Sequence, residues 1–299
     1  MNLYAHAESN TRKTWIYLSG FFLFVMGIGW AASYYLQSSG ILYFAVVLSL
    51  FMSAGSFWYS DKLVLKMSKA QPVQKKDNPE LYRAVENLAI TAGLPTPRIF
   101  VIQDKQPNAF ATGRDAKHAV VAVTTGLLEK LEPSELQGVL AHELSHIGNK
   151  DILLSTVVVV LAGVVAIIAD FFFRAAFWGG RRDDRRGGQT QGVIVLVALI
   201  FLIAVPVVSR LIQFAISRKR EFLADASGAL LSRYPEGLAR ALEKIAADPN
   251  QLKSANDATA HLYFASPFKG REQASWIHRL FMTHPPIDDR IKALREMNL

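Results

Sequence analysis

The chain of 299 residues is too apolar for an ordinary soluble protein, because 51% of it is hydrophobic and the excess lies in a few long runs. It contains no cysteine, which excludes disulfides and thiolate metal sites, so any metal must be bound through histidine and carboxylate groups. The formal net charge of +8 would suit a nucleic-acid-binding protein, but the basic residues flank the apolar runs and no nucleic-acid-binding motif is present. We therefore expect a lipid bilayer as a partner, and no nucleic acid.

Two uncharged apolar runs lie near the start of the chain. Residues 14–37 and 41–60 are each long enough to cross about 30 Å of hydrocarbon as a helix. Arg12 and Lys13 precede the first run, and an aspartate and several lysines follow the second. The positive-inside rule then predicts a transmembrane hairpin with both outer ends in the cytoplasm.

A polar segment follows the hairpin and contains both predicted helices and predicted strands. A helix is expected to begin at Asn78, which can cap it, with Pro79 at its first position. Short strands are expected at residues 98–103, 108–113 and 119–124, and a second helix at 133–148.

Two more apolar runs, residues 152–173 and 193–216, flank a loop rich in arginine, residues 174–192. If both runs cross the bilayer, this loop lies outside, against the positive-inside rule. A re-entrant hairpin is the alternative, and either arrangement leaves the flanking polar segments on one side. Asp170 and Arg174 are four residues apart and are expected to pair on one helix face.

The helix predicted at 133–148 contains an HExxH motif, His142-Glu143-Leu144-Ser145-His146. Residues four apart lie on one face of a helix, so both imidazoles can reach a single metal ion. Glu143, beside the first histidine, can take the proton from a water activated by zinc. The alternative is a chance match on an ordinary amphipathic helix, and a chain of this length and composition is expected to contain on the order of 0.01 such matches.

A hydrolytic zinc needs a third protein ligand and an open position. Asn149 and Ile152 occupy the positions that a metzincin would fill with glycine and histidine, which excludes that class. Glu221, just beyond the fourth apolar run, is the candidate third ligand. Asp225, one helical turn later, can accept a hydrogen bond from a ligand histidine. The alternative is that Glu221 is a solvated residue of a charged stretch.

Four segments together carry a family resemblance: NAFATG, AHELSHIGNKD, SRKREFLADASGALL and THPPIDDRIKAL, interleaved with the four apolar runs. In this order they resemble the HtpX family of bacterial membrane zinc metalloproteases, relatives of the CAAX prenyl proteases, over essentially the whole chain. The resemblance implies a zincin-type catalytic domain at the bacterial plasma (inner) membrane. It also implies endoproteolysis of misfolded or damaged membrane proteins in quality control and the stress response. Carried over, the zinc ligands are His142, His146 and Glu221, and Glu143 is the base.

Two further positions are candidates for the active site. Asn108, Ala109 and Phe110 lie on a predicted strand whose free edge can pair with an extended peptide substrate. The alternative is that Asn108 caps a turn and Phe110 is part of the core. His284 is a candidate oxyanion stabiliser, and the alternative is a helix-entry histidine that only packs or caps.

We therefore expect an α+β membrane protein with a zincin-like, gluzincin-type catalytic domain, mostly helical with a small β-sheet, and about four transmembrane helices. The expected divisions are a cytoplasmic N-terminus (1–13), a transmembrane hairpin (14–60), the first part of the catalytic domain (61–151), a second apolar hairpin (152–216) and the second part of the domain (217–299). The expected cofactor is one catalytic Zn²⁺, and the expected substrates are proteins or peptides, membrane proteins in particular. The catalytic domain is expected in the cytoplasm, and no oligomeric state is predicted.

Three rival functions share parts of this sequence pattern. An intramembrane protease would place HExxH inside an apolar run, whereas here it precedes one. A prenyl-protein-type processing peptidase would use the same metal chemistry, and only substrate tests separate the two. A non-catalytic membrane scaffold would hold a structural zinc, which four protein ligands normally close.

Overall fold

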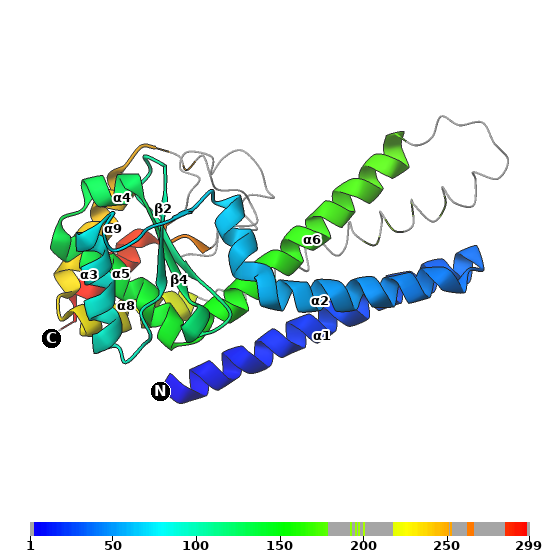
Figure 1. Ribbon diagram of the computed structural model, residues 1–299, viewed down its shortest axis with the longest axis horizontal. Helices are drawn as coiled ribbons and strands as arrows, with labels where there is room; N and C mark the ends of the chain where they lie inside the picture. Colours follow the sequence, from blue (N-terminus) through cyan, green and yellow to red (C-terminus); the bar gives the residue numbers. More distant parts are fainter. Residues whose placement is uncertain are drawn as a thin grey trace.

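In the described part of the chain, three long helices extend from one end of a globular part (Figure 1). The computed structural model describes residues 3–178, 192, 195, 197, 200, 218–250, 252, 262–265 and 285–297. In it α1 (Leu3–Leu36) and α2 (Ser39–Met67) form a hairpin, and α6 (Asp151–Trp178) packs beside them. Two helical segments in the described part of the chain, Ser9–Ala31 and Leu42–Met67, are long and apolar enough to cross a membrane.

The hairpin has an inward and an outward apolar surface. Leu18 and Phe21 of α1 pack with Val157 and Leu161 of α6 in one buried cluster. On the outer surface the large apolar side chains stay uncovered, among them Trp30 and Phe51, which are 62% and 77% exposed. Apolar surface of this extent needs a lipid or protein partner.

The third apolar run is α6, which continues from the end of the HExxH helix with only a short turn between them. Asp170 and Arg174 pair on α6 as predicted, with 2.7 Å between Oδ2 and Nε. The predicted arginine-rich loop starts too early, because residues 174–178 continue helix α6. Residues 179–191 lie outside the described part of the chain, as does the fourth run apart from single positions. One of these, Val197, is buried against α1 and α6.

The globular part is built on a four-stranded sheet with the order β1-β2-β4-β3. The strands are β1 (Gln71–Pro72), β2 (Arg98–Ile102), β3 (Ala109–Thr112) and β4 (Val120–Thr124). β4 pairs with β2 in parallel and with β3 antiparallel, which places β3 at an edge of the sheet. The three predicted strands are confirmed, and the two-residue β1 was missed.

The helix that carries the HExxH motif, α5 (Pro133–Gly148), lies at the centre of the globular core. Two glycine contacts let other helices approach it closely. A Cβ on Gly138 would come 2.8 Å from Leu238 N on α9 (Pro235–Ala247). A Cβ on Gly228 of α8 (Arg218–Ser232) would come 2.8 Å from His142 N. These glycines therefore set how near α8 and α9 lie to the motif.

The remaining helices lie mostly against α5, beside the sheet (Figure 1). α3 begins as predicted, with the Asn78 side chain accepting a hydrogen bond from Leu81 N at 3.1 Å. The helices are α3 (Pro79–Thr91), the short 3₁₀ segment η1 (Ala116–His118), α4 (Thr125–Lys130), α8 (Arg218–Ser232), α9 (Pro235–Ala247) and α11 (Ile287–Arg295). The described chain is thus mostly helical with a small sheet, as expected.

Candidate metal centre

Helix α5 presents the two motif histidines on one face. The helix begins with Pro133 at its first position, and the Glu135 side chain accepts a hydrogen bond from Glu132 N at 2.8 Å. This fixes the start of the helix. One turn separates His142 from His146, and their Nε2 atoms lie 3.1 Å apart.

Helix α8 brings Glu221 to the same point. Its Oε2 lies 3.9 Å from His142 Nε2, and its Oε1 lies 3.7 Å from His146 Nε2. Three ligands bound to one tetrahedral zinc at about 2.0–2.1 Å lie roughly 3.4 Å from one another. The observed separations fit such a site, and the three residues form a group able to hold a metal ion.

Each histidine is oriented by a carboxylate behind it. His142 Nδ1 lies 2.8 Å from Asp225 Oδ1, and His146 Nδ1 lies 3.0 Å from Asp151 Oδ2. A ring whose Nδ1–H donates to a carboxylate presents its Nε2 lone pair to a metal. The sequence pattern indicated Asp225 but missed Asp151, which lies just beyond the motif at the first position of α6.

Arg290 of α11 is a second residue that the sequence analysis missed. Its guanidinium is buried and donates two hydrogen bonds to Asp225, at 2.8 Å from Nε and 2.6 Å from Nη2. Its Nη1 donates to Phe264 O at 3.1 Å and lies 3.8 Å from Glu221 Oε2. Arg290 thus fixes the carboxylate that orients His142. The sequence signal that could have indicated Arg290 is its position in THPPIDDRIKAL, one of the four segments that carry the family resemblance.

The buried groups carry an excess of negative charge. Burial lowers the pKa of His142 to about 4 although Asp225 opposes it, so this ring is neutral, as a metal ligand must be. Burial raises the pKa of Glu143 to about 7. Burial would also lower the pKa of His146, but the surrounding carboxylates outweigh it and raise this pKa to about 9. The carboxylates are those of Glu143, Asp151, Glu221 and Asp225, and the nearby guanidinium groups are those of Arg220 and Arg290. A proton on His146 offsets part of this excess of carboxylates, and a divalent cation bound to the neutral ring would replace that proton.

A cavity of about 40 Å³ lies between these residues and the sheet edge. Its lining includes Glu143 and the three candidate ligands, with Ala111 from β3 and Tyr263 and Phe264 from the described segment 262–265. Ala111 N–H donates a hydrogen bond to Glu143. This volume has room for an ion and a water.

The residues predicted to bind substrate lie beside the cavity, at the start of β3. Asn108 exchanges hydrogen bonds with Ala265: its Nδ2 donates to Ala265 O at 2.9 Å, and its Oδ1 accepts from Ala265 N at 3.2 Å. Ala109 O accepts from Phe264 N at 2.8 Å, so this part of the edge pairs with the chain itself. Phe110 is buried and packs edge-on against Tyr263. His284 lies outside the described residues.

Comparison with known proteins gives the family. The family model described as peptidase family M48 matches residues 75–298, most of the chain. The chain belongs to peptidase family M48. Two relatives named "Protease HtpX homolog" are 46% identical (Syntrophobacter fumaroxidans, over 95% of this chain and 98% of the relative) and 44% identical (Thermococcus sibiricus, over 95% and 96%). The solved structure of S. mikatae Ste24p aligns over 98% of this chain and 66% of its own length, at 17% identity and a TM-score of 0.46.

Membership of M48 confirms the resemblance to the HtpX proteases. The chain is a metallopeptidase with zinc as its cofactor and proteins as its substrates. Together with the two candidate membrane helices, this makes it a membrane-anchored metalloprotease.

Proposed function

We propose that this M48 peptidase is an endopeptidase of the bacterial inner membrane that cleaves misfolded or damaged membrane proteins from the cytoplasmic side. The observation that carries the proposal is the convergence of His142, His146 and Glu221 around one point, with Glu143 in the same cavity. In this proposal the first three residues hold zinc in a gluzincin-type arrangement, and Glu143 is the base.

The chemistry divides between the metal and the protein. Bound zinc would polarise the scissile carbonyl and the attacking water. Glu143 accepts the proton of that water and returns it to the departing amine. Asp225 and Asp151 hold the two imidazoles in the tautomer that leaves Nε2 free, and Arg290 fixes Asp225.

The substrate backbone would lie along the edge of β3. Asn108 and Ala109 already pair with residues 264–265, and Ala111 N–H donates to Glu143, so within the described residues no further strand pairs with the edge of β3 near Ala111. A peptide paired there would run past the cavity that holds the ligands. In this reading Asn108, Ala109 and Phe110 shape the substrate groove by fixing segment 262–265.

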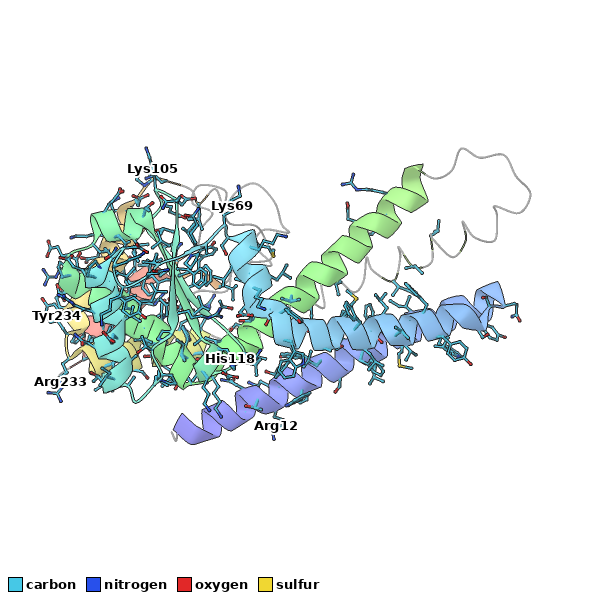
Figure 2. All side chains as sticks on the ribbon, in the orientation of Figure 1. Arg12, Lys69, Lys105, His118, Arg233 and Tyr234 are labelled. Carbon is cyan, nitrogen blue, oxygen red and sulfur yellow. The ribbon has the colours of Figure 1, made fainter. Side chains whose placement is uncertain are left out.

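The distribution of charge on the long helices supports the proposed orientation in the membrane. Arg12 and Lys69 lie at the end where α1 and α2 meet the globular part (Figure 2). Basic residues at that end favour the cytoplasm for it, and hence for the catalytic domain. The proposal includes a second hairpin formed by α6 and residues 193–216, giving about four spans.

The choice of membrane proteins as substrates rests on the short distance from the site to the membrane helices. α6 begins at Asp151, whose carboxylate contacts His146. The candidate site therefore lies at the N-terminal end of a long apolar helix. A protein embedded beside this helix would expose its cytoplasmic loops close to the cavity.

The test uses the full-length protein in liposomes that contain a membrane-protein reporter with an unfolded cytoplasmic loop. We expect the native protein to cut the loop, a chelator to stop cleavage and zinc to restore it. Glu143→Gln should retain zinc and fail to cut. Cleavage confined to prenylated peptides would replace the proposal with prenyl-protein processing. Zinc retention without any cleavage would indicate a scaffold.

A further inference from the structure

The N-terminal part of α1 contacts the globular domain through a buried polar side chain. Asn10 is 3% exposed, and its Nδ2 donates hydrogen bonds to Asp151 Oδ1 at 2.7 Å and to Asn149 O at 3.2 Å. These contacts join residues about 140 positions apart in the sequence. They place the side chain against the turn that links α5 to α6.

The other oxygen of the same carboxylate faces a candidate zinc ligand. Asp151 Oδ2 lies 3.0 Å from His146 Nδ1, on the side of the ring opposite the Nε2 atom that points to the metal centre. One carboxylate therefore bridges α1 and the imidazole. The direction in which Asp151 presents Oδ2 depends on what holds Oδ1.

Among the described residues, two groups approach Asp151 Oδ1, and Asn10 is the nearer one. Arg220 Nη1 lies 3.5 Å away, at the limit of a hydrogen bond, whereas Asn10 Nδ2 lies at 2.7 Å. Arg220 supplies a compensating positive charge, but the short bond from Asn10 fixes the orientation of the carboxylate.

Asn10 also stands out from the rest of its helix face. The next buried positions on α1 are Thr14, Leu18 and Phe21, so the stripe becomes apolar as it leaves the globular domain. Packing against α6 alone would be served by another apolar side chain, and a buried amide needs its partners. The partners of Asn10 are the two acceptors beside His146.

From these contacts we infer that Asn10 is a positioning residue for the metal centre: it holds Asp151 so that His146 presents Nε2 to zinc. The inference rests on the proposed zinc site. It gives the first helix a role beyond anchoring, because displacement of α1 from the globular domain would release the carboxylate that orients a ligand.

The experiment measures zinc affinity of the full-length protein in detergent by competition with a chelator. Loss of a partner that touches a ligand histidine weakens metal binding by roughly 10- to 100-fold. Asn10 contacts Asp151 and not the ligand histidine itself, so Asn10→Ala should weaken zinc binding less, by about 3- to 10-fold. Asn10→Asp should weaken it more, because a second carboxylate cannot donate to Asp151 and repels it.

The control is Thr14→Val on the same buried face. Thr14 donates its hydroxyl hydrogen bond to Asn10 O, within its own helix, at 2.9 Å. This nearly isosteric change should leave zinc affinity native. If Asn10→Ala does not fold, Asn10→Gln keeps the amide but misplaces it, and an intermediate loss of affinity is expected.

A double-mutant cycle separates positioning from packing. In an Asp151→Ala background, Asn10→Ala should have no further effect on zinc affinity, because the group through which it acts is gone. Native affinity in Asn10→Ala and Asn10→Gln, or an effect of Asn10→Ala that persists without Asp151, would overturn the inference. His146→Ala tests the site itself: if that variant binds zinc as the native protein does, the proposed metal centre fails instead.

Discussion

Gly228 is the point at which α8 touches the backbone of α5, and we expect Gly228→Ala to disturb the metal centre directly. The new Cβ would lie 2.8 Å from His142 N and 3.0 Å from His142 Cα, whereas ordinary contacts begin at 3.4 Å. Because both neighbours are backbone atoms of a buried helix, α8 must retreat by about 0.6 Å.

The two consequences of this retreat differ in size. Overpacking costs about 1–3 kcal/mol, and alanine regains about 1 kcal/mol of helix propensity over glycine, so the fold loses roughly 1 kcal/mol. Glu221 lies two turns before Gly228 on the same face and moves with α8. Metal–ligand distances tolerate only about 0.2 Å, so we expect zinc affinity to fall at least about tenfold.

The assay is chelator competition for zinc, run beside thermal unfolding of the metal-free protein. Gly148→Ala is the matched control, since among the described residues its Cβ would meet only Leu94 Cδ1 within 4 Å, at an ordinary 3.9 Å. Native zinc affinity in Gly228→Ala would refute the reasoning, as would an equal loss in Gly148→Ala.

Three further predictions concern catalysis, stability and pH. Glu143→Gln should lower kcat by roughly 100- to 10,000-fold with zinc content unchanged, measured on a peptide substrate; retention of activity would remove Glu143 as the base. Arg290→Met should cost about 3–5 kcal/mol in denaturant unfolding because it leaves Asp225 charged and buried, and a loss below 1 kcal/mol would contradict this. Although burial opposes it, Lys130 holds the pKa of Asp248 below its usual value. The stability that this carboxylate contributes is therefore present at neutral pH and lost as pH falls below about 4. The gap in unfolding free energy between the native protein and Asp248→Asn should shrink in that range, and a gap independent of pH would count against it.

The sequence predicted those features that local patterns carry. The HExxH spacing, the start of α3 and the three longer strands all depend on residues within a few positions of one another. β1 was missed because two residues that include a proline carry no strand periodicity. Its pairing with β2 is set by tertiary contacts.

The parts of the site that escaped prediction depend on contacts between distant segments. Arg290 reaches Asp225 across 65 positions and Asn10 reaches Asp151 across 141. No period or spacing relates such residues, and each looks like an ordinary polar residue in its own neighbourhood. Glu221 was predicted because a hydrolytic zinc bound by the HExxH motif needs a third protein ligand, and a glutamate can supply it.

The docking of Arg290 near the end of the chain has a consequence for how the protein is made. A growing chain that has completed the HExxH helix still lacks Glu221, and one that has added Glu221 still lacks the guanidinium that holds Asp225. Metal affinity is gained with the folded arrangement. The newly synthesised protease should therefore acquire full metal affinity only after α11 has been translated and has packed against α8.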